Sequence, residues 1–262
     1  APNTRSGWQR KLSWLAALLS LGGVAAALIA SVGSGMGLWH FRIGFTVLRY
    51  AFYAAAAGGV LALIAIIAGL VRRTGPGKLN LLSLGAALLF TLYLGQMVMT
   101  ARSVPAIHDA STDLEDLPAF TTLQVRPDNL ENVPDEGRPE LARLDPESRW
   151  KAIHRRAYDD LRTLRVPTGV AETTERAADL ARSRGWDIAR FDRDAGIVEA
   201  TATSRFFRFK DDVVIRVRPD PPRPGGSLVD MRSISRVGGS DVGMNAKRIR
   251  AFLSDLHSSP AD

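Results

Sequence analysis

Acidic residues are confined to one part of this 262-residue chain. All 27 Asp and Glu residues follow Arg102, and none precedes it. The acid-free part contains three apolar runs without a charged residue, at 12–31, 50–71 and 79–101. Each has the roughly 20 residues that a helix needs to cross about 30 Å of hydrocarbon. A cleaved signal peptide has a shorter apolar core and no further runs behind it. The sequence therefore predicts three membrane spans followed by a water-soluble domain.

The net charge of +7 invites a nucleic-acid partner, but its distribution excludes one. Residues 1–102 carry nine Lys and Arg, whereas residues 103–262 carry 25 bases against 27 acids. A nucleic-acid-binding domain concentrates its positive excess on the folded part. Here the excess lies at the ends of the apolar runs, where Lys and Arg set membrane topology. We therefore expect a lipid bilayer and a membrane protein as partners, and no nucleic acid.

The same bases predict the orientation. Six bases lie before the first run or between the second and third runs: Arg5, Arg10, Lys11, Arg72, Arg73 and Lys78. Three bases lie on the opposite side of the membrane: Arg42, Arg49 and Arg102. Cytoplasmic loops carry the excess of Lys and Arg. The prediction is a multi-pass protein of the bacterial inner membrane with a cytoplasmic N-terminus. Three crossings then place the C-terminal domain in the periplasm.

Composition divides the chain into a three-span helical membrane domain at 1–102, a Pro- and acid-rich linker at 103–148 and a soluble α+β domain at 149–262. Asp145-Pro146 predicts a helix N-cap with Pro at the first helical position. In the last part, apolar spacing and Gly185 predict helices at 150–164, 170–184 and 241–257. Alternation and turn residues predict strands at 186–191, 197–205, 206–210, 213–218 and 228–237. The expected fold is an antiparallel sheet of four or five strands with helices packed on one face.

The connection between the first two spans is apolar and aromatic. Trp39, Arg42 and Arg49 are predicted to anchor it at headgroup depth. Recognition of a lipid headgroup or a partner is the alternative. Small residues four apart predict close helix packing: Gly22, Ala26 and Ala30 in the first span, and Ala55 and Gly59 in the second. No ionisable residue lies at mid-depth, which disfavours a transporter or channel.

His108, Asp109 and Asp113 form the most promising polar cluster. An imidazole with two carboxylates can bind a divalent cation or place a general base. The alternative is a solvated loop whose Asp and Ser side chains cap turns. No second histidine motif completes a metal set, and the chain contains no cysteine. We therefore expect no metal, no cofactor and no assigned catalytic residue.

Four arginines are predicted to alternate outward on two strands: Arg216, Arg218, Arg232 and Arg236. Cross-strand ion pairs with Glu199 and Asp230 explain such a pattern. A face that binds an anion or an acidic partner is the functional alternative. Residues 210–212 fall between two predicted strands and are expected to form a hairpin turn. His154 borders an apolar helical stripe and is expected to be structural.

Four stretches carry a resemblance to a known family: 107–113 (IHDASTD), 197–203 (IVEATAT), 209–217 (FKDDVVIRV) and 232–245 (RSISRVGGSDVGMN). In this order they resemble domain-of-unknown-function family 1499, across about residues 103–257. The three spans are similar to those of longer bacterial members. The resemblance implies a small α/β domain, often attached to membranes in bacteria and plastids. It implies no activity.

These observations favour a non-enzymatic integral membrane protein whose periplasmic domain docks onto, or stabilises, a larger membrane assembly. Occurrence of similar domains in plastids suggests a respiratory or photosynthetic membrane, by analogy alone. The alternative is a periplasmic enzyme or ligand-binding module for an anionic envelope compound. His108, Asp113 and the arginines would then form its site.

Overall fold

The computed structural model describes residues 6–258, so Arg5 of the predicted charge asymmetry lies outside the described residues. The chain forms two compact units. One contains three long helices together with residues 205–208, and the other contains a sheet with shorter helices.

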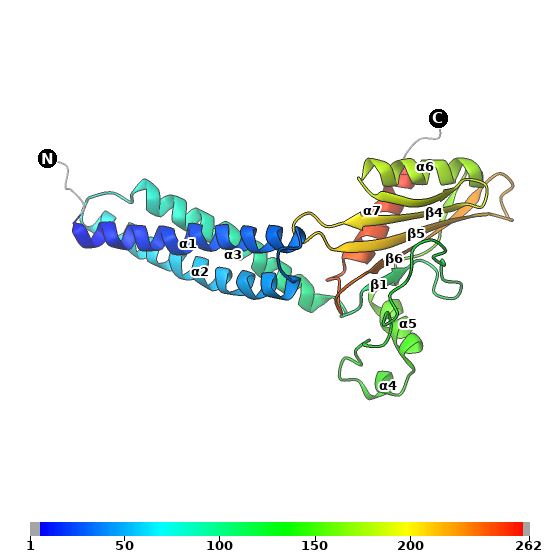
Figure 1. The fold of residues 1–262 in the computed structure, drawn as a ribbon, viewed down its shortest axis with the longest axis horizontal. Helices are drawn as coiled ribbons and strands as arrows, with labels where there is room; N and C mark the ends of the chain where they lie inside the picture. The colour runs from blue at the N-terminus through cyan, green and yellow to red at the C-terminus, as the bar shows by residue number, and fades with distance from the viewer. Residues whose placement is uncertain (1–5, 259–262) are drawn as a thin grey trace. The chain divides into compact units, whose positions relative to one another are not determined.

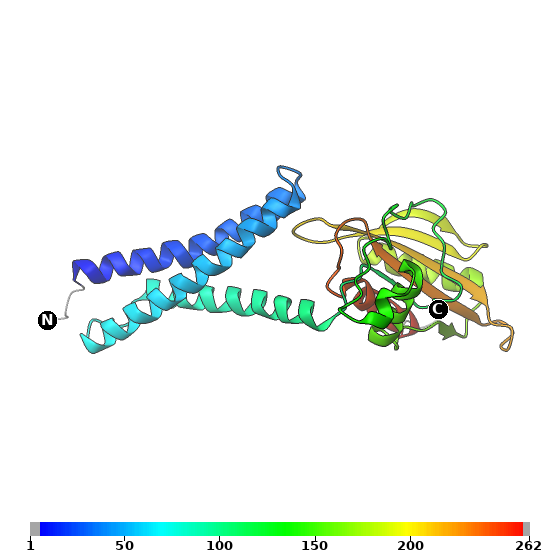
Figure 2. The same ribbon diagram turned by 90° about the horizontal axis from the view of Figure 1, so that it is seen from below.

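The helical unit contains α1 (Gly7–Gly35), α2 (Phe41–Val71) and α3 (Lys78–Ser103). All three are long and apolar enough to cross a membrane, so three long apolar helices lie where the spans were predicted. Figure 2 shows α1 and α2 side by side and α3 diverging from them. The helices extend beyond the predicted apolar runs, so Arg42 and Arg49 lie in α2 rather than in a connecting segment.

Backbone-to-backbone packing joins α1 to α2. A Cβ added at Gly58 would lie 2.4 Å from the Ser20 nitrogen, and one at Gly23 would lie 2.9 Å from the Ala51 oxygen. The buried face of α1 therefore consists of small residues: Ala16, Ser20, Gly23, Ala27 and Ala30. Of the predicted small residues, Ala30 in α1 and both Ala55 and Gly59 in α2 are buried, whereas Gly22 and Ala26 are displaced from this face and only half-buried. A strict spacing of four drifts around a helix of 3.6 residues per turn, whereas alternating three and four keeps one face.

The second unit contains an antiparallel six-stranded sheet in the order β1-β6-β5-β4-β3, with β2 also paired to β6. Its strands are β1 (Asp109–Ser111), β2 (Leu164–Val166), β3 (Asp187–Asp192), β4 (Ile197–Thr203), β5 (Lys210–Pro219) and β6 (Ser227–Ser235). The two three-residue strands β1 and β2 were not predicted. Strands this short carry no period-2 pattern, and both are paired to β6.

Two predicted elements are wrong: a predicted strand is a turn, and a predicted turn is part of a strand. Residues 206–210 were expected to form a strand, but 205–207 form the turn of the β4–β5 hairpin. Residues 210–212 were expected to form a turn, but they belong to β5, where Asp212 pairs with Thr201 and Ile234. Aromatic residues favour strands, and Asp favours turns. Tertiary pairing overrides both preferences here.

Up to residue 258, this unit also contains four helices: α4 (Pro139–Ala142), α5 (Pro146–Ala157), α6 (Val170–Ser183) and α7 (Met244–Ser258). The Asp145 carboxylate caps α5 by accepting from the Ser148 amide at 3.0 Å, and Pro146 occupies the first turn. The chain leaves α6 through Gly185, whose φ of +71° favours glycine. Both signals were predicted correctly, but α5 ends at Ala157 and does not continue to the predicted end at 164, where β2 begins.

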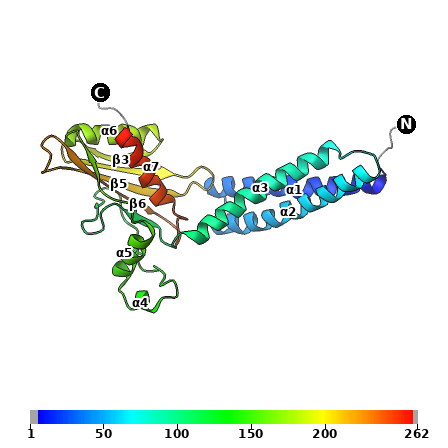
Figure 3. The ribbon, with the colours of Figure 1, turned by 180° about the vertical axis from the view of Figure 1, so that it is seen from behind.

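Helices α6 and α7 cover one face of the sheet, which confirms the predicted α+β class. Figure 3 shows α7 crossing the sheet beside β6, with α6 next to β3. The core between the layers contains Val198, Val213, Ile215, Met231 and Phe252, all without solvent exposure. Alternate residues of each strand point to this apolar layer.

The opposite face of the sheet is polar and is covered by irregular chain. In Figure 1 the segment after β1 passes in front of β5 and β6, while α7 lies behind them. We call residues 112–138 the cover segment. The strand register places Glu199 beside Val214, and Val214 beside Arg232, on this covered face. Charged side chains are therefore enclosed between the sheet and the cover segment.

Candidate functional site

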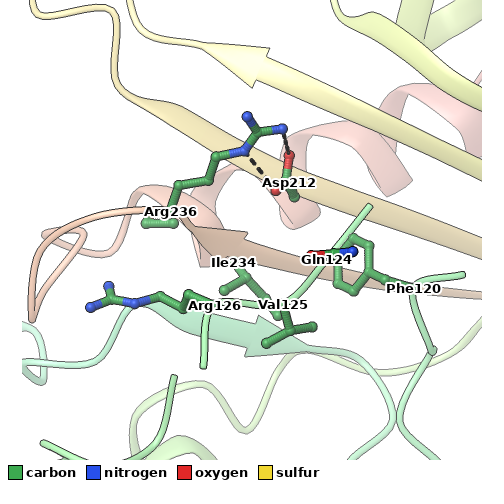
Figure 4. Close-up of a pocket in the computed structure, with 8 residues that line it drawn as sticks. Phe120, Gln124, Val125, Arg126, Asp212, Ile234 and Arg236 are labelled. Atoms are coloured by element: carbon green, nitrogen blue, oxygen red, sulfur yellow. Dashed lines mark hydrogen bonds and ion pairs between the residues drawn. The ribbon is translucent and has the colours of Figure 1, made fainter. Parts of the chain in front are cut away.

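A cavity of about 190 Å³ lies between the cover segment and the sheet. Figure 4 shows Ile234 and Val125 facing the cavity, with Asp212 and Arg236 on one side. Register places Asp212 of β5 directly opposite Ile234 of β6. The complete lining is Phe120, Gln124, Val125, Arg126, Asp212, Ile234, Ser235 and Arg236. The cavity thus has an apolar floor and a charged rim.

Glu199 holds the cover segment beside this cavity. Its carboxylate is fully buried and accepts from the amides of Thr121 at 2.8 Å and Leu123 at 2.7 Å, and also from the amide of Thr122. The Thr121 hydroxyl donates to the same carboxylate. Burial raises the pKa of Glu199, but these hydrogen bonds outweigh it and leave the pKa below its ordinary value. A charged Glu199 therefore fixes the start of the cavity wall.

Arg236 and Asp212 form a bidentate ion pair on the rim. Nε and Nη2 of Arg236 each donate to the Asp212 carboxylate at 2.8 Å. Nη2 also donates to the Thr201 hydroxyl at 3.1 Å. The Asp212 carboxylate raises the pKa of Arg236, so the guanidinium stays charged. Its side chain is 42% exposed, and Nη1 has no hydrogen-bond partner within residues 6–258.

Arg126 closes another part of the rim, and each of its three guanidinium nitrogens already donates a hydrogen bond within the domain. Nε and Nη2 bind Asp128 at 2.7 and 2.6 Å, and Nη1 donates to the Gly238 carbonyl at 2.7 Å. The Arg126 hydrogen bond lowers the pKa of Asp128 to about 2. Arg126 therefore ties the cover segment to the loop after β6. Of the two rim arginines, Arg236 is therefore the one with a guanidinium nitrogen available to bind an external anion.

The predicted cluster of His108, Asp109 and Asp113 is divided between separate partners. Asp109 is 1% exposed, and its carboxylate accepts from Arg232 at 2.7 Å and from Asn129 at 2.7 Å. The Asp113 carboxylate instead caps a turn by accepting from the Glu115 and Asp116 amides. Within residues 6–258, no group of three or more His, Cys, Asp or Glu could hold a metal ion.

The expected solvated loop is wrong for His108, which is 7% exposed. Its carbonyl accepts from the Ser235 amide at 3.0 Å, because β1 adds to the edge of β6 immediately after it. Its Nε2 is buried without a hydrogen-bond partner among the described residues. A base role for this imidazole stays a prediction.

All four predicted arginines have carboxylate partners in the same domain. Arg218 donates to the fully buried Asp230 at 2.6 Å, and Arg216 does so at 3.2 Å. Both also bind carboxylates of the cover segment, on Asp113 and Asp116. The buried Arg232 pairs with Asp109, and Arg236 pairs with Asp212. Cross-strand pairing with Asp230 was expected, whereas the partners on the cover segment were not. The expected pairing of the arginines with Glu199 is wrong, because that carboxylate accepts from amides of the cover segment.

His154 lies inside the domain. Its Nε2 accepts from the Ser111 amide at 3.1 Å, and its ring lies 5.6 Å from that of Trp150. Burial lowers the pKa of His154 to about 4. The imidazole is therefore neutral near pH 7 and joins α5 to β1, which matches the expected structural role.

The predicted interfacial anchor belongs to the helical unit. The Trp39 indole donates to the Ala30 carbonyl at 2.9 Å and packs against Gly33, so its nitrogen is bound to α1. Arg42 follows the N-cap His40 in the first turn of α2. The Arg49 guanidinium lies 5.4 Å from the Tyr50 ring. Anchoring by these three residues stays a prediction.

Several residues around the cavity escaped the sequence analysis. Arg126, Gln124 and Phe120 were grouped into a linker because its prolines predict no regular structure. Glu199 gave one usable signal, because it is a carboxylate between Val198 and Ala200 in an otherwise apolar strand. A buried charge needs partners. The sequence does not indicate that those partners are amides some 76–78 residues away.

Fold and site together define a class of protein: three helices able to span a membrane, joined to an α+β domain with a cavity on the covered face of its sheet. Residues 109–256 match the family described as protein of unknown function (DUF1499). The match covers more than half of the chain, so the chain belongs to this family, as the resemblance predicted. No curated protein matches the chain.

Proposed function

We propose that this protein is a non-enzymatic integral membrane protein whose soluble domain docks onto a larger membrane assembly. The charge asymmetry of the loops supports a cytoplasmic N-terminus and a periplasmic domain in a bacterial inner membrane. The observation that carries the docking role is Nη1 of Arg236. This nitrogen has no hydrogen-bond partner within residues 6–258, and it lies at the rim of a small cavity with an apolar floor.

The chemistry of the cavity indicates what docks there. A guanidinium held in place by Asp212 presents its remaining N–H groups in a fixed direction, which suits a carboxylate. Ile234 and Val125 accept the apolar atoms beside that carboxylate. The volume of about 190 Å³ is below the roughly 300–1,000 Å³ of sites for whole small molecules. An acidic side chain of a protein partner therefore fits better than a complete metabolite.

An anionic envelope compound is the second candidate, because its charged end would bind the same Arg236 nitrogen. The two candidates differ in what accompanies the purified protein. A protein partner gives a stoichiometric complex in detergent extracts of native membranes. A small compound leaves a lone protein whose extracted ligand is visible by mass spectrometry.

Val125 offers a test that leaves the ion pairs intact, because it is 38% exposed and has no polar group. Val125→Glu places a carboxylate in the cavity, where it binds Arg236 and repels an acidic partner. Val125→Gln is the matched control of the same size without charge. We expect the glutamate variant to lose the complex by about tenfold and the glutamine variant to keep most of it. Equal recovery of the complex with both variants would exclude this cavity as the docking site.

The orientation is tested separately with reporter fusions. A fusion after the last residue should be active only with periplasmic reporters, and a fusion at Thr74 only with cytoplasmic reporters. The opposite pattern would reverse the assignment from the loop charges.

A further inference from the structure

The β4–β5 hairpin ends in a tip that the docking proposal does not use. The tip consists of Arg205, Phe206, Phe207 and Arg208. Ser204 closes it, because the Ser204 amide donates to the Phe209 carbonyl and the Phe209 amide donates to the Ser204 hydroxyl, both at 2.8 Å. Arg208 has a φ of +52°, the left-handed conformation of a tight turn. The tip therefore has a defined shape.

The side chains of this tip are of the kind found where membranes meet water. Phe206 is 44% exposed, and the Arg205 guanidinium lies 5.8 Å from its ring. No acidic residue occurs from 203 to 210, whereas Lys210 adds a third positive charge. Aromatic rings lie at headgroup depth, and Lys or Arg binds anionic headgroups there. The Phe207 ring lies 4.8 Å from the ring of Phe45 in α2, which leaves Phe206 as the exposed aromatic residue between the bases of the tip.

The sheet register places this tip at a particular end of the domain. Thr203 pairs with Lys210, Asp211 with Ser235, and Ile234 with Asp109 at the start of β1. The tip and the beginning of β1 therefore lie at the same end of the sheet. Three strand spacings of about 4.8 Å separate β4 from β1, or about 14 Å.

The same end receives the chain from the last membrane-spanning helix. α3 ends at Ser103, and β1 begins at Asp109. Six residues span at most about 20 Å even when fully extended. This end of the sheet is therefore held within reach of the headgroups through which α3 leaves the bilayer. Val237, in the loop after β6 at the same end, is another exposed apolar residue, at 42%.

We propose that the hairpin tip inserts Phe206 into the headgroup region of the bilayer, where Arg205 and Arg208 bind anionic headgroups. This contact gives the soluble domain a second attachment besides the covalent connection to α3. It rests on the membrane anchoring proposed above, but it does not depend on the docking cavity or on which side the domain occupies.

The absence of cysteine from the chain allows a direct test by spin labelling. The full-length protein is reconstituted into vesicles of phosphatidylethanolamine and phosphatidylglycerol with one nitroxide, at Phe206→Cys or at Arg205→Cys. The second position keeps all aromatic residues of the tip. Pro222→Cys, in the exposed β5–β6 turn at the other end of the sheet, is the matched control. Vesicle flotation first establishes that each protein is inserted in the membrane.

We expect both tip labels to be accessible to oxygen and protected from a water-soluble nickel chelate by at least about threefold relative to the label at 222. Labels at the tip that are as accessible to nickel as the control would overturn the proposal. Labels protected from both reagents would also overturn it, because they would be buried against protein. Failure of flotation would instead contradict the membrane anchoring itself.

Discussion

The two units of this protein differ in the contacts that pack their elements together, as expected for units in different solvents. In the helical unit, α1 and α2 approach so closely that a Cβ at Gly58 would collide with the backbone of α1. In the soluble unit, one face of the sheet is apolar, and the other encloses ion pairs such as Asp109–Arg232 at 2.7 Å. Lipid removes the hydrophobic driving force between helices, so close contact of small residues replaces it. In water, the hydrophobic effect packs the apolar face of the sheet against its helices. The charged face is stable only when each buried charge has an oppositely charged partner.

The largest effect should follow from breaking a buried ion pair. Asp109→Ala leaves the Arg232 guanidinium, only 10% exposed, without its carboxylate. We expect the free energy of unfolding of the soluble domain to fall by about 3–5 kcal/mol. The measurement is urea-dependent hydrogen exchange of peptides from β5 and β6 in the full-length protein in detergent micelles. Peptides of α1 and α2 should keep their protection.

A paired replacement separates the loss of a partner from the loss of charge. Asp109→Leu with Arg232→Met removes both charges and should recover much of the stability lost in Asp109→Ala. If Asp109→Ala alone costs less than about 1 kcal/mol, the pair behaves like one in open solvent. The two units would then differ only in how their apolar residues pack, and not in a dependence on buried ion pairs.

The next effect concerns pH and should be restricted to the soluble unit. The folded-state pKa of His154 is about 4 against 6.5 for an unperturbed imidazole. The unfolded chain therefore binds a proton that the folded chain does not, and stability falls as the pH drops from 6.5 towards 4. The linked change is on the order of 3 kcal/mol. Carboxylates with a lowered pKa, such as Glu199, lose their contribution only below the ordinary value of 4.5.

Urea unfolding midpoints between pH 7 and pH 4.5 test this effect. His154→Gln can still accept from the Ser111 amide and should flatten the profile in that interval. A wild-type midpoint that does not change with pH would contradict a buried neutral imidazole.

The smallest of the three effects concerns the helical unit. Gly58→Ala introduces a Cβ into the backbone of α1 and should weaken the α1–α2 contact by about 1–3 kcal/mol. Gly85→Ala in α3 is the matched control, because no atom lies within 4 Å of its added Cβ. The control should be neutral or slightly stabilising, since Ala favours helices over Gly. Thermal unfolding of both variants in micelles measures the difference, and equal melting would contradict the close packing.

Elements with a strong local signal could be predicted. Apolar length specified the three long helices, and the Asp145-Pro146 cap and Gly185 correctly marked the ends of α5 and α6. Residues 206–210 and 210–212 were misassigned because aromatic and acidic residues prefer the opposite elements. The start of β5 is decided by pairing with both β4 and β6, and such pairing is not local information.

The candidate site shows the same limit. Arg236 was identified as outward-facing from alternation in its predicted strand, and the structure places it on the cavity rim. The cavity itself could not be predicted, because half of its lining belongs to a Pro-rich segment without periodicity. That segment is positioned by Glu199, whose hydrogen bonds reach amides 76–78 residues away.

The sequence by itself determined the division into three apolar helices and an α+β domain, because hydrophobic length, periodicity and charge act over neighbouring residues. Tertiary structure alone decided which charges stay available. Arg216, Arg218 and Arg232 bind carboxylates brought from β1, β6 and the cover segment, while Arg236 retains a free Nη1 among the described residues. The reason is physical: a buried charge is stable only with a partner within hydrogen-bond distance, and that distance is fixed by the folded sheet and its cover.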